Sequence, residues 1–235
     1  MDMFNLTGMT ILVTGASGGI GLALVQGFLE AGGKVVAIDL NSSALEDAFS
    51  GNERVMPVSL DLMDLDGIRD ILNKMRDRFG PIDVLVNNAG IKSAERLIDG
   101  DHSEIQRTLA INVDAVLNLT RFVFEDCFKG RGGRIINIGS SISSRGAVFN
   151  YQAGGADYCY SKAIVHDLTR LIAFEVAPEG VTVNAIAPGI VHTPMHGRPL
   201  DETEARHAGR IPLGRIGQPT DIVGAAVFLA SKSAN

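Results

Sequence analysis

The sequence predicts an α/β fold: one doubly wound parallel sheet with helices on both faces. Short apolar runs without polar alternation alternate with amphipathic stretches along the whole chain. This pattern is typical of parallel strands that are buried on both faces and joined by crossover helices. Glycine, asparagine, aspartate or serine follows each apolar run, where a strand would give way to a loop. No linker or repeat divides the 235 residues, so we expect a single domain over residues 1–235.

The elements of the first part of the chain are recognised by apolar runs and by the residues that end them. Gly32-Gly33 ends the first helix, Ser42 or Ser43 is placed to cap the second, and Gly80-Pro81 closes the third. In order, we expect a strand at Met9–Val13, a helix at Gly19–Ala31, a strand at Lys34–Asp39, a helix opening near Ser42 or Ser43, a strand at Arg54–Ser59, a helix at Leu65–Phe79 and a strand at Ile82–Asn87.

The rest of the chain continues the alternation. Apolar residues at helical spacing predict a long helical region, and Pro178 stops the helix that follows the fifth strand. In order, we expect a helical region at Ser103–Phe128, a strand at Gly133–Ile138, a helix at Asp157–Ala177, a strand at Val181–Ile186 and a helix at Pro219–Ala230.

Composition excludes several classes of protein. The net charge of −6 and the pI near 5.3 argue against a nucleic-acid partner, which would require a basic face. Cys127 and Cys159 are too few for a disulfide framework and fit free thiols in a reducing cytoplasm. The N-terminus has no signal-peptide pattern, and the apolar runs are too short to cross a membrane. We therefore expect a cytoplasmic protein with neither a nucleic-acid nor a membrane partner.

The polar and glycine-rich residues fall where such a Rossmann-type sheet binds ligands, beyond the carboxyl ends of its strands. Glycines after the first strand allow a tight turn and let the backbone approach a pyrophosphate at a helix N-terminus. The residues at these strand ends are Gly15–Gly21, Asp39, Asp61, Asn87–Gly90, Ser140 and Pro188-Gly189.

Asp39 favours NAD over NADP. It ends the second predicted strand, eighteen residues beyond Gly21. An acid about twenty residues after the glycines accepts hydrogen bonds from the adenosine ribose and repels a 2′-phosphate. Leu40 and Asn41 follow it, so no basic residue is placed directly after Asp39 to bind that phosphate. The alternative interpretation of Asp39 is a turn aspartate.

Tyr158 and Lys162 stand four residues apart, which places phenol and ammonium on one face of a helix. A nearby ammonium favours phenolate, and a phenol needs such help because its unperturbed pKa is about 10. The pair therefore predicts a tyrosine that is acidified for proton transfer. A surface ion-dipole pair is the alternative. Tyr160 and Tyr151 are nearby, but neither has a lysine four residues on.

Together these residues resemble the short-chain dehydrogenase/reductase family, in its one-domain Tyr-x-x-x-Lys branch. The matches occur in the family's order over nearly the whole chain. Gly15, Gly18 and Gly21 also fit the spacing of a longer, epimerase-like branch, but the Asn-Asn-Ala-Gly run and the Pro-Gly loop favour the dehydrogenases. The matching segments are Thr14–Gly21, Asn87–Gly90, Asn112, Ser140, Tyr158–Lys162, Pro188–Met195, Ile211–Gly217 and Phe228–Ser231.

The resemblance implies a role for each site residue. Tyr158 would exchange a proton with the substrate oxygen during hydride transfer, and Lys162 would also hold the nicotinamide ribose. Ser140, with Ser141 as runner-up, would bind the reacting oxygen, and Asn112 would hold a water in a proton relay. Thr193 would contact the carboxamide. The expected cofactor-binding residues are Gly15, Ser17, Gly19, Ile20, Gly21, Asp39, Asp61, Leu62, Asn88, Ala89, Gly90, Tyr158, Lys162, Pro188, Gly189, Val191 and Thr193.

No metal site is expected. His192 and His196 are four residues apart, but they flank Pro194 in an expected loop and lack a third ligand. The acidic run Asp201–Glu204 is interpreted as a solvated helix start in a substrate lid.

The expected function is an NAD-dependent oxidoreductase that interconverts a secondary alcohol and a ketone. Ser143 replaces a glycine usual in the family, and the interval from Ser140 to Tyr158 is longer than usual. Asn150, Tyr151 and Gln152 in this interval suggest a polyol, sugar or sugar acid as substrate. The alternatives are an NADPH-dependent 3-oxoacyl-thioester reductase and a catalytically silent NAD-binding regulatory protein.

The resemblance also implies a homotetramer or a homodimer. Relatives continue beyond the segment that matches Phe228–Ser231 into one more parallel strand. We therefore expect that this chain lacks that last C-terminal strand.

Overall fold

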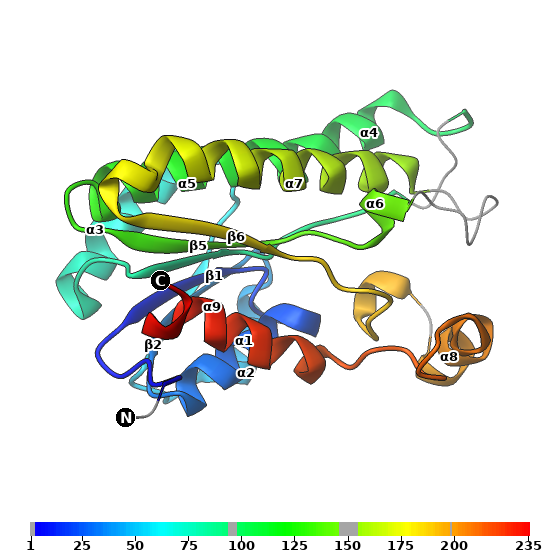
Figure 1. The fold of residues 1–235 in the computed structure, drawn as a ribbon, viewed down its shortest axis with the longest axis horizontal. Coiled ribbons are helices and arrows are strands. Elements are labelled where there is room, and N and C mark those ends of the chain that lie inside the picture. The colour runs from blue at the N-terminus through cyan, green and yellow to red at the C-terminus, as the bar shows by residue number, and fades with distance from the viewer. Residues whose placement is uncertain (1–2, 94–97, 146–154, 198) are drawn as a thin grey trace.

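The computed structural model describes every residue except 1–2, 94–97, 146–154 and 198. Its centre is one six-stranded parallel sheet in the order β3-β2-β1-β4-β5-β6 (Figure 1). The predicted doubly wound fold is confirmed. The strands are β1 (Thr10–Thr14), β2 (Lys34–Asp39), β3 (Val55–Ser59), β4 (Val84–Asn87), β5 (Gly133–Ile138) and β6 (Val181–Ile186).

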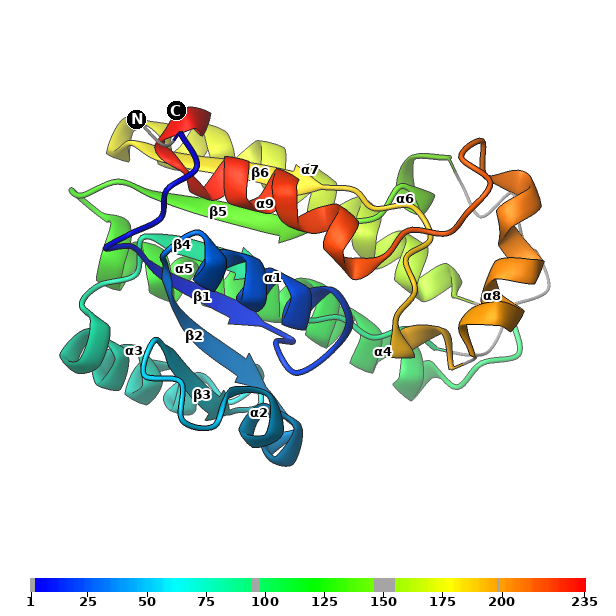
Figure 2. The same cartoon turned by 90° about the horizontal axis from the view of Figure 1, so that it is seen from below.

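Helices cover both faces of the sheet (Figures 1 and 2). Side chains of α1, α2 and α9 pack on one face, and those of α3, α5 and α7 on the other. The helices are α1 (Gly19–Glu30), α2 (Ser42–Phe49), α3 (Leu65–Phe79), α4 (His102–Leu109), α5 (Ala115–Val123), α6 (Ile142–Arg145), α7 (Ala156–Val176), α8 (Leu200–His207) and α9 (Val223–Ala230).

Strand β1 explains why the predicted strands lack polar alternation. Ile11 and Val13 belong to the core cluster under α1, whereas Leu12 belongs to the cluster under α3 and α5. Successive side chains of a strand point to opposite faces, so both positions must be apolar when helices cover both faces.

The predicted long helical region is interrupted. It begins at His102, and two π-helical turns, Ala110–Asp114 and Phe124–Phe128, lie before and after α5. Apolar spacing did not reveal these turns, because a π turn differs from an α turn by only one residue in its hydrogen-bond spacing. The first of these turns contains Asn112, and such turns are frequently found at functional sites.

Capping differs from the prediction in one place. Asn41, not Ser42 or Ser43, is the N-cap of α2, and its side chain accepts from the backbone N–H of Ala44. Ser43 instead donates its hydroxyl to Asn41 Oδ1 at 2.9 Å. Asparagine is as good an N-cap as serine. The last helical segment also differs, since Pro219–Ile222 forms a 3₁₀ turn before α9 begins. The helices α6 and α8 were not predicted as separate elements, although α8 contains the expected helix start at Asp201–Glu204.

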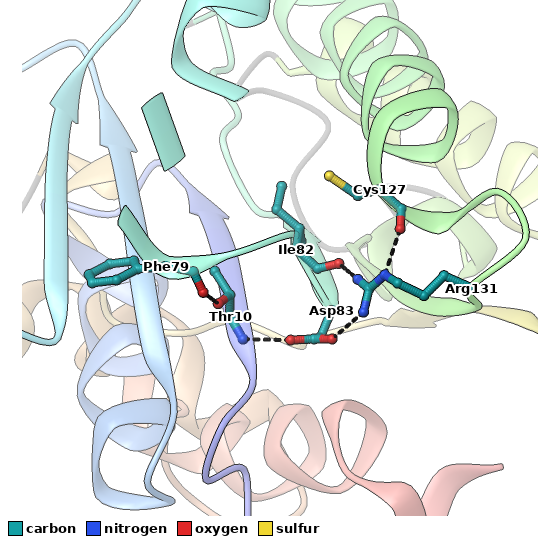
Figure 3. A network of polar contacts seen from close by, with 6 residues as sticks. All are labelled: Thr10, Phe79, Ile82, Asp83, Cys127 and Arg131. Atoms are coloured by element: carbon teal, nitrogen blue, oxygen red, sulfur yellow. Dashed lines mark hydrogen bonds and ion pairs between the residues drawn. The ribbon is translucent and has the colours of Figure 1, made fainter. Parts of the chain in front are cut away.

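The amino ends of β1 and β4 are tied together by a polar network (Figure 3). One carboxylate oxygen of Asp83 accepts from the Thr10 backbone N–H at 2.8 Å, and the other contacts the Arg131 guanidinium at 2.8 Å. Arg131 also donates to the backbone carbonyls of Ile82 and Cys127. Thr10 Oγ1 donates to the Phe79 carbonyl. This network fixes the end of the sheet opposite to the expected site.

Strand β6 lies at one edge of the sheet and pairs only with β5 among the described residues. A further strand on its free edge therefore stays a prediction. No helix within the described part of the chain combines the length and apolar character needed to cross a bilayer.

Candidate active site

The turn after β1 approaches the loop after β4 very closely. Asn88 Nδ2 donates to the Thr14 carbonyl at 2.9 Å and to the Gly15 carbonyl at 3.1 Å. Thr14 Oγ1 accepts from the backbone N–H groups of Asn88 and Ala89, both at 3.0 Å. A Cβ on Gly21 would lie 1.9 Å from the Gly15 oxygen, so only glycine fits there. The predicted glycine turn and Asn88–Ala89 therefore form one unit.

Helix α1 presents an uncapped N-terminus at this turn. Its N-cap residue, Gly18, makes no side-chain hydrogen bond to the helix. The first N–H groups of a helix have no partners within it, and together with the helix dipole they bind phosphate. Ile20 packs against the core with its side chain. The expected contribution of Gly19 and Ile20 to a pyrophosphate site thus lies in their backbone.

The loop after β6 closes against the same turn. Gly19 has φ +53°, and a Cβ there would lie 3.1 Å from Thr193 Cγ2. Val191, which is buried, forms a bridge with Gly217 that anchors this loop. The Pro188 carbonyl accepts from the Ser141 backbone N–H at 2.9 Å. The structure therefore brings the loops after β1, β5 and β6 together at the carboxyl ends of the strands, on the side of the molecule where α6 and α8 lie (Figure 2).

Asp39 faces the glycine turn. Its Oδ2 accepts from the Ser17 backbone N–H at 3.0 Å, and its Oδ1 accepts from that of Asn41 at 3.1 Å. A carboxylate offers about four acceptor sites, so Asp39 can accept further hydrogen bonds from ribose hydroxyls. These contacts show that the alternative, a turn aspartate, describes part of its role.

Asp61 and Leu62 differ in exposure. Asp61 is exposed, and its Oδ1 accepts from the backbone N–H of Met63 at 2.9 Å. Leu62 is buried in the core cluster shared with α3, so only its backbone is left for a cofactor contact.

Tyr158 stands at the start of α7, and the side chain of Ser140 is near enough to influence the pKa of its phenol. Burial raises the pKa of the Tyr158 phenol above its ordinary value, and the Ser140 side chain opposes this only in part. The prediction that Lys162 acidifies the tyrosine is wrong for this structure. The desolvation of a phenolate outweighs the effect of Ser140.

Lys162 is buried, with 4% of its surface exposed. Its Nζ donates to the Ile138 carbonyl at 2.7 Å and lies 5.8 Å from the centroid of the Tyr158 ring. Burial lowers the pKa of Lys162 to about 8. A surface pair is thereby excluded, because Lys162 is held beneath the surface at the end of β5 and Tyr158 is half-buried. Tyr160, in contrast, is 59% exposed.

Asn112 is fully buried in the π turn. Its Oδ1 accepts from the Ile91 backbone N–H, and its Nδ2 donates to the Ile91 carbonyl and to Ser161 Oγ, all at 2.9 Å. A Cβ on Gly90 would lie 3.3 Å from Asn112 Oδ1 and 3.5 Å from Lys162 Nζ. Any water held by Asn112 must therefore use the second lone pair of Oδ1 or the backbone.

His166 contacts the backbone of Ser140, although it was not among the predicted site residues. Its Nε2 lies 3.3 Å from the Ser140 backbone nitrogen and 3.2 Å from the Ser140 carbonyl oxygen. A Cβ on Gly139 would lie 2.5 Å from this nitrogen, so the glycine makes room for the imidazole. His166 follows Lys162 by four residues, and this helical spacing was the available signal.

Asp157 was also missed. Its carboxylate is buried and accepts from Thr108 Oγ1 at 2.6 Å, from Ser93 Oγ at 2.9 Å and from the Ser93 backbone N–H at 3.1 Å. Burial alone would raise the pKa of Asp157, but these bonds and the Tyr158 backbone N–H hold it below its ordinary value.

A chain of buried amides lies beneath the site. Asn87 and Asn137 are register partners in β4 and β5, and Asn87 Nδ2 donates to Asn137 Oδ1 at 2.9 Å. Asn137 Nδ2 continues to Thr169 Oγ1, and Asn87 also reaches Thr120 Oγ1. Every member is bonded, as buried polar groups require.

Some predicted residues lie elsewhere or outside the described part. Asn150, Tyr151 and Gln152 are outside the described residues. His196 Nε2 lies 2.9 Å from the Val191 carbonyl oxygen, and burial lowers the pKa of this imidazole. Within the described ranges, no group of three histidine, cysteine or acidic side chains is arranged to hold a metal ion.

Comparison with known proteins agrees with this geometry. Residues 9–204 match the family model for short chain dehydrogenase. The chain is 37% identical over 233 residues to a 3-oxoacyl-[acyl-carrier-protein] reductase of Vibrio cholerae, covering 98% of this chain and 93% of that protein. It is 33% identical over 240 residues to a 2-dehydro-3-deoxy-D-gluconate 5-dehydrogenase of Dickeya dadantii, covering 100% of this chain and 93% of that protein.

Solved structures agree as well. A short-chain type dehydrogenase/reductase from Mycobacterium marinum superposes with a TM-score of 0.89 at 34% identity, covering 99% of this chain and 92% of that one. A 3-ketoacyl-(acyl-carrier-protein) reductase from Brucella melitensis complexed with NADH gives a TM-score of 0.87 at 28% identity, covering 98% and 93%. The chain belongs to the short-chain dehydrogenase/reductase family and is an oxidoreductase that acts on CH–OH groups with a nicotinamide cofactor.

Proposed function

We propose that the protein is an NAD-dependent oxidoreductase that interconverts a secondary alcohol and a ketone, with Tyr158 as its general acid and base. The observation that carries the proposal is the burial of Lys162 beside the Tyr158 ring, with its Nζ bonded to the Ile138 carbonyl at the end of β5. A catalytically silent protein has no need to bury an ammonium at this position, because burial of a charge costs free energy.

The residues present fit a dinucleotide. The uncapped N-terminus of α1 suits a pyrophosphate, and Gly21 lets α1 pack closely against the turn at Gly15. Asp39 would hold the adenosine ribose, and its charge would oppose a 2′-phosphate, which favours NAD over NADP. Lys162 and Thr193 would hold the nicotinamide end. When bound, this cofactor supplies the hydride chemistry.

The protein's own groups handle the proton. In reduction, the Tyr158 hydroxyl donates a proton to the carbonyl oxygen, while Ser140 Oγ holds that oxygen. The raised pKa of Tyr158 keeps the phenol protonated at neutral pH and so suits reduction in the free enzyme. In oxidation, Tyr158 must first lose its proton, and the Lys162 Nζ lies 5.8 Å from the centroid of its ring.

Two substrate classes are supported. A polyol, sugar or sugar acid is our first candidate, supported by the 33% identical relative whose name specifies a deoxygluconate derivative. A 3-oxoacyl thioester is supported at least as well, by relatives of up to 37% identity named as acyl-carrier-protein reductases. In that second case the cofactor would be NADPH.

Turnover on a matched panel tests the proposal. Sugar acids, polyols and a 3-oxoacyl thioester are each assayed with all four nicotinamide cofactors, following absorbance of the reduced form. We expect turnover of a CH–OH or ketone substrate, with a higher kcat/KM for NAD(H). Binding of NADH without turnover of any class would favour the silent protein instead.

A homo-oligomer, tetramer or dimer, is also proposed. It is supported by Leu171 and Phe174, which are exposed on α7. Apolar side chains of this size on one helix are typical of an interface. Light scattering on the eluting protein would measure the assembled mass.

A further inference from the structure

Two polar rungs connect helix α7 to the helical segment before α5. In the first rung, Thr108 Oγ1 donates to Asp157 Oδ2 at 2.6 Å. In the second, Asn112 Nδ2 donates to Ser161 Oγ at 2.9 Å. Thr108 and Asn112 are four residues apart, and so are Asp157 and Ser161. The two rungs therefore lie one helical turn apart on facing helix surfaces.

Each rung also holds one residue of the loop after β4. Asp157 accepts from the backbone N–H and the hydroxyl of Ser93. Asn112 bonds both backbone groups of Ile91. This loop directly follows Asn88–Gly90, which approaches the glycine turn and Lys162. The two rungs therefore fix the position of the loop after β4 relative to the site.

The catalytic pair lies next to the rungs in sequence. Tyr158 follows Asp157, and Lys162 follows Ser161. Ser161 Oγ donates to the Tyr158 carbonyl at 2.8 Å, so the rungs are also linked along α7. Helix α7 begins at Ala156 after Gly155, which makes no side-chain cap, so its first turn depends on such external contacts.

We propose that Asp157 and Thr108 form a positioning pair that holds the first turn of α7 and the Ile91–Ser93 loop, and thereby places Tyr158 and the cofactor-facing backbone for the proposed reaction. The inference rests on the proposed function for its link to catalysis. Asp157 touches neither substrate nor cofactor in this scheme. A carboxylate suits this position better than an amide, because the N–H groups of Ser93 and Tyr158 can only donate and both hydroxyls donate to Asp157 here.

Four substitutions separate positioning from simple stability. Thr108→Val keeps the volume and removes the hydroxyl, whereas Thr108→Ser keeps the hydroxyl and removes a buried methyl. Asp157→Asn keeps the shape of the side chain. It replaces one accepting oxygen by an amide NH₂ group that faces the groups donating to Asp157. Asp167→Asn is the matched control, because Asp167 is exposed on the same helix and its carboxylate pairs with the exposed Arg170.

The first measurement is hydrogen exchange of the cofactor-free protein over residues 88–93. Thr108→Val and Asp157→Asn are expected to raise exchange in this segment, while Thr108→Ser and Asp167→Asn leave it as in the wild type. Calorimetric titration with NADH should show weaker binding for Thr108→Val and Asp157→Asn than for the wild type. Unchanged exchange and unchanged NADH affinity in Asp157→Asn would overturn the proposal, whatever the enzyme's substrate proves to be.

The second measurement is the split between kcat and KM, with Tm recorded for every variant. Displacing a catalytic group by about 1 Å can cost 10²-fold in rate. We expect kcat to fall about 10- to 100-fold in Thr108→Val and to recover in Thr108→Ser, although the serine variant has the lower Tm. If kcat instead follows Tm across the four variants, Thr108 and Asp157 are merely structural. Absence of wild-type turnover would count against the proposed function, and the exchange result would still decide the positioning.

Discussion

Lys162 Nζ donates to the backbone carbonyl of Ile138, the last residue of β5, at 2.7 Å. This bond ties the helix that carries Tyr158 to the carboxyl end of the sheet. It also holds an ammonium where little water reaches it, and burial lowers the pKa of Lys162 to about 8. The position of the lysine thus has a free-energy cost that depends on pH.

That cost can be measured with Lys162→Met. The folded pKa of about 8 lies below the ordinary value of 10.5, so the unfolded chain binds more protons between these values. The free energy of unfolding of the wild type should therefore rise relative to the variant from pH 8 towards pH 10.5, by about 3 kcal/mol at most. Urea unfolding at several pH values measures the difference. A difference that is independent of pH would contradict the assigned shift.

Tyr158 should titrate above its ordinary pKa in the cofactor-free protein, because burial disfavours phenolate. The absorbance of phenolate is followed to high pH in the wild type and in Tyr158→Phe. Since the chain has three tyrosines, the difference between the two curves isolates Tyr158. A difference curve with its midpoint below about 10 would restore the acidified tyrosine that the sequence suggested.

Tyr158→Phe should abolish turnover and leave NADH binding nearly intact. The change removes one hydroxyl and keeps the ring, and a positioned acid or base contributes roughly 10²–10⁴-fold. Tyr160→Phe is the matched control, because Tyr160 is exposed on the same helix. Steady-state rates and NADH fluorescence measure the two quantities. Equal loss of rate in both variants would remove Tyr158 from its assigned role.

Gly21→Ala should destabilise the turn and weaken NADH binding. Its Cβ would lie 1.9 Å from the Gly15 oxygen, so the turn must open, and overpacking of this kind costs about 1–3 kcal/mol. Gly18→Ala provides the comparison, since nothing lies within 4 Å of its Cβ and its φ of −161° is extended. Thermal unfolding and calorimetric titration of both variants test the contrast. Similar behaviour of the two would show that the close approach is not required.

Asp39→Ala should shift cofactor preference towards NADPH. The carboxylate that opposes the 2′-phosphate is lost, and like charges placed together cost several kcal/mol, so the NADPH-to-NADH ratio of kcat/KM should rise about tenfold or more. Asp47→Asn, on the exposed side of α2, controls for general loss of negative charge. A wild type that already prefers NADPH would overturn the assignment of Asp39.

The sheet was predictable because its strands are apolar on both faces and end at residues with distinct chemistry. Leu12 and Val13 belong to core clusters on opposite faces of the sheet, and both lie in a strand that was predicted to be buried. The pairing of Tyr158 with Lys162 followed from helical spacing, whereas the choice of Ser140 followed from the family resemblance. The sign of the Tyr158 shift did not, because spacing locates charges but gives no measure of burial. Asp157 was missed for a related reason: its partners lie forty-nine and sixty-four residues away.

The bonded amides of Asn87 and Asn137 have a consequence for how the sheet assembles. A one-residue slip between β4 and β5 would send one amide to the opposite helical layer and break the hydrogen bond between the two amides. Strands that carry only aliphatic side chains have few contacts that distinguish one register from the next. This pair, fifty residues apart in sequence, therefore acts as an alignment check during folding, at the two strands whose ends carry the reaction.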